Sequence, residues 1–262
     1  MCLHSDTIEI SMNIIVLLKQ VPDTTAKISI SSGFMDESTI SKWSMSPYDE
    51  FALESALQLK QNCNGNLIAI TCGPDRCSKM LTDAAAVGTD KLIHIHHEGY
   101  LDSIQTQTLL VAAIKKFEGE VIMCGKQAAD TNSGSTGPGV AELIGASCIT
   151  HVSEVKYENE ELIATRLNSL GFEIISTSPP SIFAFDKGVK ELRRPNVRGI
   201  MMAKKKEITR LTPDDLGVSL TNSDINLISQ MPPSEKAPGQ KYEGIDSIHE
   251  IVSKLRDEAN VI

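Results

Sequence analysis

Residues 121–144 read VIMCGKQAADTNSGSTGPGVAELI, and this stretch decides the fold. Its apolar start, residues 121–124, predicts a buried β-strand. A loop of Gly, Ser, Thr, Asn and Asp follows, and residues 140–144 then have the spacing of a helix. The first N–H groups of a helix are free and its macrodipole favours negative charge. A strand, a small-residue loop and a helix in this order therefore suit a phosphate group.

The loop matches neither of the common nucleotide-binding fingerprints. It contains no GxxxxGK[ST] P-loop and no tight GxGxxG turn. An ordinary connection from a strand to a helix is also rich in small polar residues. From this segment alone, phosphate binding and a plain connection are about equally favoured.

Outward from this stretch, strands and helices alternate along the chain. The predicted strands cover residues 13–18, 67–72 and 91–96, and the predicted helices cover residues 47–60, 79–87 and 103–117. Continuous apolar strands are typical of a parallel sheet that is covered on both faces. The pattern predicts an α/β fold with a doubly wound, mostly parallel sheet, which binds ligands at the carboxyl ends of its strands. Leu17, Cys72 and Gly125 stand at such ends, which favours the nucleotide interpretation.

The character of the chain changes near residue 150. Residues 152–167 and 171–177 predict a small antiparallel extension, and residues 181–185 predict another apolar strand. The chain is then basic and irregular to residue 198. From residue 212 it is rich in Pro and polar residues and ends in a short helix at 244–260, with too little apolar material for its own core. We expect a nucleotide-binding domain at 12–211 and an arm at 212–262 that packs on a partner subunit or is disordered.

Residues 1–11 form a leader of uncertain structure. They have neither the basic start nor the apolar core of a signal peptide. Because Met12 directly precedes a strong strand, the leader is interpreted as an upstream start or a disordered tail.

The composition excludes several classes of protein. A net charge of -9 gives no general support for a nucleic-acid partner, and no window is apolar enough to insert into a membrane. No pairing of a nucleophile with a base is evident, so we assign no catalytic residues.

The cysteines and histidines offer no convincing metal site. The cysteines form no CxxC pair and are interpreted as buried thiols in a reducing, cytoplasmic compartment; they are Cys2, Cys63, Cys72, Cys77, Cys124 and Cys148. His94 and His96 alternate with Ile on a predicted strand, and His97 follows them. A half-exposed strand is favoured over a metal site.

Five segments together resemble the beta subunit of electron transfer flavoprotein, in that family's order and spacing. They are MNIIVLLKQVPD from Met12, MSPYDEFALESALQLK from Met45, ITCGP from Ile70, GKQAADTN…STGP from Gly125 and PNVRGIMMAKKK from Pro195. The resemblance covers nearly the whole chain from Met12. It implies a Rossmann-like fold of the adenine nucleotide alpha hydrolase-like kind and an electron carrier rather than an enzyme.

The resemblance also implies the cofactors and partners. The chain would bind AMP and pair with an alpha subunit that holds the redox-active FAD. The heterodimer would carry electrons from flavin dehydrogenases, such as those that act on acyl-CoA in fatty acid oxidation, to an acceptor oxidoreductase. The implied nucleotide-binding residues are Leu17, Ser46, Pro47, Tyr48, Asp49, Cys72, Gly125, Lys126, Gln127, Ala128, Ala129, Asp130, Thr131, Asn132, Ser133, Gly134, Ser135 and Thr136.

A second segment matches the family's loop for recognising dehydrogenases. Its residues are Glu191, Leu192, Arg193, Arg194, Pro195, Asn196, Val197 and Arg198. The family usually has Leu as the apolar anchor, and here the residue is Val197. We expect the arginines to form a polar rim around this anchor.

Three other functions stay open. In electron-bifurcating members of the family, a second FAD replaces AMP; Gly137-Pro138 agrees with those members, whereas Thr136 does not. A stand-alone adenine-nucleotide-binding regulator of the universal-stress type would have a similar sheet but no reason for the arm. A ligase-like enzyme that cleaves ATP would need a pyrophosphate loop of the SGGxDS type, which is missing after the first strand.

Overall fold

The computed structural model describes residues 12–220, 223, 225–235 and 238–262, so the leader at 1–11 lies outside the described residues. The described chain divides into two compact units. The first comprises residues 12–29 and 36–227, and the second comprises residues 30–35 and 228–262.

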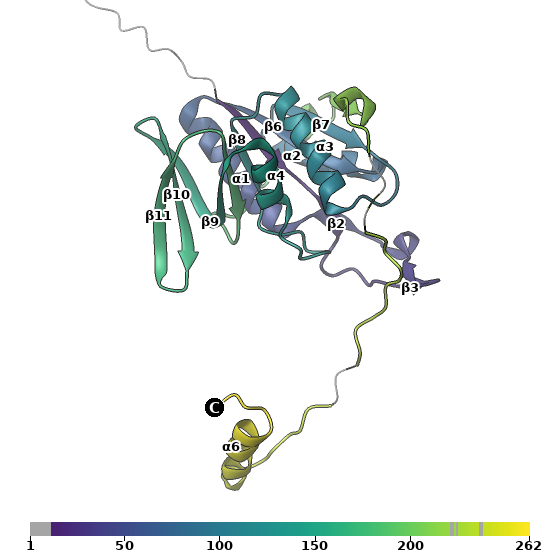
Figure 1. Cartoon of the computed structure of the whole chain (residues 1–262), viewed down its shortest axis with the longest axis vertical. Helices are drawn as coiled ribbons and strands as arrows, with labels where there is room; N and C mark the ends of the chain where they lie inside the picture. Colours follow the sequence, from purple (N-terminus) through teal and green to yellow (C-terminus); the bar gives the residue numbers. More distant parts are fainter. Residues whose placement is uncertain (1–11, 221–222, 224, 236–237) are drawn as a thin grey trace, which may run out of the picture. The chain divides into compact units, whose positions relative to one another are not determined.

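A nine-stranded sheet forms the centre of the first unit (Figure 1), in the order β11-β10-β9-β12-β8-β1-β6-β7-β13. The strands from β12 to β13 are parallel to their neighbours, and β9 pairs parallel with β12 but antiparallel with β10. The predicted antiparallel extension is therefore continuous with the main sheet. The strands are β1 (Asn13–Leu17), β6 (Asn66–Gly73), β7 (Lys91–His96), β8 (Val121–Gly125), β9 (Ser147–Glu158), β10 (Glu161–Asn168), β11 (Gly171–Thr177), β12 (Ser181–Phe185) and β13 (Ile208–Leu211).

Helices cover both faces of the sheet. Alternate residues of β1 take part in two separate clusters: Ile14 and Val16 pack with α1 and α2, whereas Ile15 and Leu17 pack with α3 and α4. This two-sided burial confirms the predicted doubly wound sheet and explains why its central strands are continuously apolar. The helices are α1 (Pro47–Cys63), α2 (Ser78–Val87), α3 (Ser103–Lys116) and α4 (Thr136–Ile144).

Local sequence signals set the ends of these helices. Pro47 occupies the first turn of α1 and Gly88 ends α2 with a φ of +124°. Asp102 and Gln105 form a capping box at the start of α3. The expected helices and strands before residue 150 are confirmed, with ends shifted by a few residues.

Two short elements were missing from the prediction. Helix α5 (Val197–Ala203) begins inside the segment expected to be irregular, with the Asn196 side chain accepting from the N–H of Gly199 at 2.7 Å. Strand β13 pairs with β7 at the edge of the sheet. Both elements are too short to show a clear period, and their stability comes from packing against the rest of the unit.

The predicted start of the arm at residue 212 differs from the structure. Leu216, Val218 and Leu220 pack against the cluster that α3 and α4 cover, and η3 (Asp214–Leu216) lies among them. Residues 212–220 therefore belong with the first unit, because three of their apolar side chains help to cover its core.

Short strands and turns link β1 to α1. β2 (Gln20–Pro22) pairs antiparallel with β5 (Trp43–Met45), and a short helix, η1 (Glu37–Thr39), precedes β5.

The second unit joins two segments that are distant in the sequence. The hairpin of β3 (Ile30–Ser31) and β4 (Phe34–Met35) meets Gln230, whose side chain accepts from the N–H of Met35 at 2.8 Å. The N–H of Gln230 in turn donates to the carbonyl of Gly33 at 2.7 Å. Later in this unit, η4 (Ile245–Ser247) leads into α6 (Ile248–Asp257).

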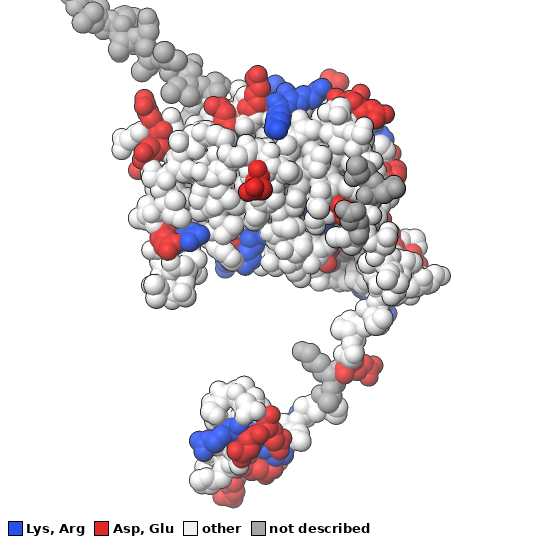
Figure 2. All heavy atoms as spheres, viewed as in Figure 1, with Lys and Arg blue, Asp and Glu red and all other residues white. Residues whose placement is uncertain are grey.

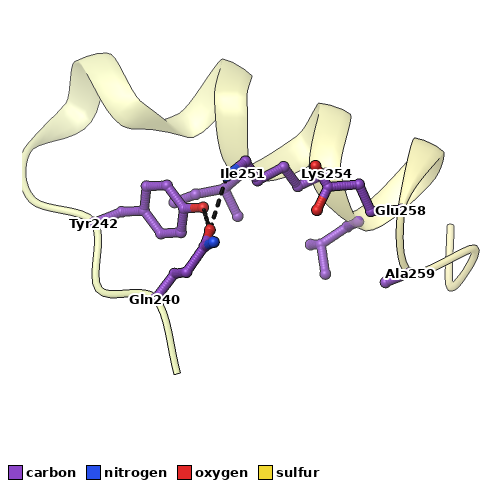
Figure 3. Close-up of a pocket in the computed structure, with 7 residues that line it drawn as sticks. Gln240, Tyr242, Ile251, Lys254, Glu258 and Ala259 are labelled. Carbon is purple, nitrogen blue, oxygen red and sulfur yellow. Dashed lines mark hydrogen bonds between the residues drawn. The ribbon is translucent and has the colours of Figure 1, made fainter. Parts of the chain in front are cut away.

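A shallow pocket lies against α6 (Figure 3). Gln240 accepts hydrogen bonds from the hydroxyl of Tyr242 and from Nζ of Lys254, the latter at 2.8 Å. Nζ of Lys254 also lies over the Tyr242 ring, 5.4 Å from its centroid. These contacts fold the chain before α6 back along the helix.

Within the described residues, no helix combines the length and the apolar character needed to cross a bilayer.

Candidate functional site

Three predicted strand ends meet at the centre of the sheet. β1 lies between β6 and β8, and the chain proceeds from β1 to β6 and β7 on one side before it returns to β8 on the other. Leu17, Cys72 and Gly125 stand at or next to the carboxyl ends of these strands. The topological switch point therefore lies between β1 and β8, where ligands of such sheets bind.

The buried carboxylate of Asp49 joins the ends of β1 and β8 at this switch point by hydrogen bonds. Asp49, in the first turn of α1, accepts from the N–H of Lys19 at 2.7 Å and from the N–H of Gly125 at 2.9 Å. Burial raises the pKa of Asp49 to about 7, whereas the two N–H bonds act in the opposite direction. Both carboxylate oxygens are engaged by the backbone, so Asp49 shapes the crevice and positions its walls.

Gly125 is required by the close approach of α1 to β8. A Cβ at this position would lie 2.5 Å from Oδ1 of Asp49 and 2.7 Å from Cβ of Tyr48. The glycine therefore lets the start of α1 close one side of the crevice.

The loop at residues 126–135 is held at several points. Nζ of Lys19 pairs with the Asp130 carboxylate at 2.7 Å, across the switch point. Nζ of Lys126 pairs with Asp186 at 2.8 Å and lies 5.0 Å from the centroid of the Tyr48 ring. The loop therefore has a defined path over the strand ends before it enters α4.

A hydrogen bond and a left-handed glycine inside the loop also fix its course. Nε2 of Gln127 donates to Oδ1 of Asn132 at 2.9 Å, and Gly134 has a left-handed φ of +65°. The other predicted residues of the loop lie along the same path; they are Ala128, Ala129, Thr131 and Ser133.

The N-terminus of α4 faces the end of this loop. Ser135 is its N-cap residue, but its side chain makes no capping hydrogen bond. The carbonyl of Ser135 accepts from Nε2 of Gln107 at 3.0 Å, which ties α4 to α3. The N–H groups of Thr136 and Gly137 lie in the first turn, where a helix offers no carbonyl partner. The helix start offers an anion two backbone donors and the Thr136 hydroxyl, whereas Oγ of Ser135 donates weakly to Oγ of Ser103, at 3.4 Å.

Close packing fixes this helix start against the sheet. A Cβ on Gly137 would lie 3.2 Å from Sγ of Cys124 and 3.3 Å from Cβ of Ala184. On Gly139, a Cβ would lie 2.3 Å from the Gln107 side chain. The glycines of the TGPG sequence therefore bring α4 close to both β8 and α3.

Two buried hydroxyl groups near the strand ends lack partners. Ser46, just before Pro47 of α1, is fully buried, and its Oγ makes no hydrogen bond among the described residues. The same holds for Oγ1 of Thr71, next to Cys72. A buried polar group without a partner costs about 1–3 kcal/mol. The Ser46 hydroxyl therefore fits a site that gains its partner from a bound ligand.

The predicted recognition segment contacts α1, and helix α5, which begins at its end, packs on α2. Arg193 forms a bidentate pair with the buried Glu54 of α1, with Nη2 and Nε at 2.8 and 2.9 Å from its oxygens. The pair lowers the pKa of Glu54, against the effect of burial. Arg193 thus anchors the segment, which leaves Arg194 and Arg198 for the expected polar rim.

Val197, the expected apolar anchor, is 76% exposed at the start of α5. Met201 and Met202 are also exposed, at 61% and 60%, so α5 presents an apolar surface that the sequence did not predict. Gly199 lets α5 pack on α2, since a Cβ there would lie 2.4 Å from the carbonyl oxygen of Ala86. The capping residue Asn196 before an apolar run was the available sequence signal.

Several expectations about cysteine and histidine are wrong. Cys148 is exposed rather than buried, and Cys63 and Cys72 are only partly buried. Burial raises the pKa of the Cys72 thiol to about 12. His94 is 1% exposed, so β7 is not half-exposed at that position.

The chain matches known proteins over almost its full length. The family model described as "Electron transfer flavoprotein domain" matches residues 38–216. The electron transfer flavoprotein subunit beta of Bacillus subtilis is 34% identical over 258 residues, with 96% of this chain and 100% of that protein covered. The subunit of the same name from Thermoanaerobacterium thermosaccharolyticum is 32% identical, with coverage of 95% and 98%, and that from Dictyostelium discoideum is 31% identical, with 93% and 98%. The predicted resemblance is confirmed, and the chain belongs to the electron transfer flavoprotein family, among its beta subunits.

Proposed function

We propose that this chain is the AMP-binding subunit of a heterodimer that carries electrons through an FAD held mainly by its alpha subunit. Electrons would come from flavin dehydrogenases, such as acyl-CoA dehydrogenases in fatty acid oxidation, and would pass to an acceptor oxidoreductase. This subunit would make and break no bonds itself. Its part is to hold a nucleotide, to support the partner that carries the flavin and to present a docking surface.

The N-terminus of α4 at the switch point is the single observation that carries the proposal. The first-turn N–H groups of Thr136 and Gly137, together with the hydroxyls of Ser135 and Thr136, match the oxygens of a phosphate. The buried, unpartnered Oγ of Ser46 can hydrogen-bond a nucleotide hydroxyl or ring nitrogen. The residues present therefore fit an adenine nucleotide with one phosphate.

The bifurcating alternative, with a second FAD in place of AMP, receives less support. Gly137-Pro138 is the feature shared with those members, but the structure gives Gly137 a packing role against Cys124 and Ala184. That role exists whichever nucleotide is bound. A larger ligand is thus not needed to explain the glycine.

The partner subunit is inferred from the family and from the second unit. Relatives are named subunit beta, which implies a second subunit. Ile245, Ile248, Val252 and Leu255 of η4 and α6 are all exposed, which provides an apolar surface for it. Cys63, Cys72, Cys77, Cys124 and Cys148 are free thiols, which suits a carrier in a reducing compartment such as the cytoplasm.

The test is to co-express this chain with an alpha subunit and to identify the nucleotides released from the purified complex by mass spectrometry. We expect one AMP and one FAD per heterodimer. Thr136→Glu should abolish the AMP content, because its carboxylate would oppose the phosphate, whereas Thr136→Ser should retain it. Two FAD molecules per heterodimer would support bifurcation, and unchanged AMP in Thr136→Glu would contradict the assigned site.

A further inference from the structure

Two histidines and a carboxylate meet at the carboxyl ends of β6 and β7. His94 and His96 belong to β7, and Asp75 lies in η2 (Asp75–Cys77), directly after β6. The ligand atoms that these three side chains offer all lie within 4.8 Å of one another. Three donors from two separate elements therefore surround one small volume.

His94 has one ring nitrogen fixed by the backbone. Its Nε2 lies 2.9 Å from the carbonyl oxygen of Gly73, which can only accept, so Nε2 carries the proton. Nδ1 then has the lone pair and lies 3.2 Å from the hydroxyl of Ser78. A hydrogen bond from one ring nitrogen to a backbone carbonyl is the usual support of a histidine that binds a metal through the other.

The two ring nitrogens of His96 each lie near a carboxylate. Its Nε2 lies 3.8 Å from Oε1 of Glu98, and its Nδ1 lies 3.2 Å from Oδ1 of Asp75. Nδ1 is buried and makes no hydrogen bond among the described residues, despite that short distance. Nδ1 of His96 is thus a buried nitrogen without a hydrogen-bond donor or acceptor among the described residues, and it faces a carboxylate oxygen across a gap that a metal ion would fill.

We propose that Asp75, His94 and His96 bind one divalent transition-metal ion, with Zn²⁺ as the expected occupant. Two imidazole nitrogens and a carboxylate are a donor set for Zn²⁺ and its first-row neighbours, with water in the remaining position. Ligands at 2.0–2.1 Å from a tetrahedral zinc ion are ~3.3 Å apart. The separation of 3.2 Å between His96 and Asp75 already matches this value.

One basic side chain competes with the ion. Nη1 of Arg210, on β13, lies 2.6 Å from Oδ1 of Asp75, and both side chains are more than half exposed. Such an exposed ion pair contributes little to stability, so the Arg210 side chain can leave Asp75 when a metal ion binds. Removal of the guanidinium should therefore strengthen metal binding, a result that a purely structural role of the histidines would not produce.

Metal binding would join η2 to β7 around the end of β6. That end carries Cys72 and Gly73, at the edge of the crevice between the strand ends. The bound ion would restrain this wall of the crevice, so it should raise the melting temperature of the chain.

The experiment titrates Zn²⁺ into the untagged full chain, with its alpha subunit where the complex is needed, after removal of metals by EDTA. Isothermal titration calorimetry should show one ion per chain. Asp75→Asn and His96→Gln should weaken binding at least tenfold, Arg210→Ala should strengthen it, and the matched control His97→Gln should leave it unchanged. These side chains are not fully buried, and circular dichroism verifies that each variant is folded.

Co²⁺ provides a second readout of the ligands. A site made of nitrogen and oxygen should give weak visible absorption without the strong near-ultraviolet band of a cobalt–thiolate bond. A thiolate band would place the ion on the cysteines near β6 and overturn the proposal. Equal Zn²⁺ affinity in the wild type and His96→Gln would overturn it as well.

Discussion

The two units of the chain differ in how they cover their apolar residues. In the first unit, helices cover both faces of the parallel part of the sheet, and side chains such as Ile14, Phe183 and Phe185 are completely buried. In the second unit, none of the ten residues of α6, all of which are described, is buried, and Ile245 just before it is 82% exposed. Figure 2 shows acidic and basic atoms on one part of this helix and uncharged atoms on the rest.

This difference shows that the first unit covers its own apolar core, whereas the second unit needs a partner to cover its apolar residues. A sheet with helices on both faces removes its own apolar surface from water. An apolar helix stripe without a cover is an aggregation liability unless another surface meets it. The first unit therefore supplies the stable fold and the crevice that we propose for the nucleotide, and we expect the second to bind the alpha subunit.

Removal of residues 228–262, the C-terminal part of the second unit, should have the largest effect on assembly. A chain that ends at Leu227 keeps the residues that cover the core, such as Leu216 and Leu220. We expect it to fold but to lose stoichiometric co-purification with the alpha subunit, because the contact stripe is gone. Size-exclusion chromatography and the FAD content of the eluted complex measure this effect.

A chain that ends at Arg210 is the informative comparison. It also loses Leu216 and Leu220 and should melt at a lower temperature than the chain that ends at Leu227. Unaltered co-purification of either shortened chain would mean that the arm does not hold the heterodimer together.

A pair of glycine substitutions compares the packing of the two units. Gly125→Val should lower the free energy of unfolding by about 3 kcal/mol, because the new side chain would collide with Asp49 and Tyr48. Gly239→Ala, in the second unit, meets nothing within 4 Å and should change stability by less than about 0.5 kcal/mol. Urea denaturation monitored by circular dichroism measures both values. Equal losses of unfolding free energy in the two variants would contradict the proposed difference in packing between the two units.

Asp49 should make the first unit sensitive to pH. Its pKa is raised from 3.8 to about 7, so its stabilising contribution is complete below pH 4 and is lost as the pH rises towards and through 7. The unfolding free energy of the wild type minus that of Asp49→Asn should fall by more than about 1 kcal/mol across this range. Denaturation at pH 4, 5.5, 7 and 8 tests this, and a constant difference would show that the carboxylate stays ionised throughout.

Val197→Ala should have the smallest effect on the isolated chain. Because Val197 is exposed, the substitution should leave stability, AMP and FAD unchanged. The smaller side chain should weaken docking by about 1 kcal/mol, which raises the KM for the carrier in a dehydrogenase assay roughly fivefold. Lys187→Ala, on an exposed stretch before the segment, serves as the control. An unchanged KM would exclude Val197 as the anchor.

Much of the fold could be predicted because it depends on local patterns. A few residues suffice to recognise the apolar runs of β1, β6 and β8 as strands. The same holds for α1, whose apolar residues recur with the period of a helix. Helix α5 and β13 could not be identified in this way, since each spans seven residues or fewer. The convergence of the three strand ends was predicted and is confirmed by the order of β6, β1 and β8. Nothing in the sequence indicated that both oxygens of Asp49 would accept hydrogen bonds from backbone N–H groups.

The sequence by itself determined the alternation of strands and helices, the family and the position of helix α4, whose N-terminus we propose as the phosphate site. The tertiary structure decided which distant groups meet. Gly125 donates to Asp49 across 76 positions, and Met35 donates to Gln230 across 195. Asp75 likewise reaches His94 and His96 only because β6 and β7 lie side by side. Periodicity reports which face of an element is buried, but contacts between elements depend on their packing in three dimensions, which no local pattern contains.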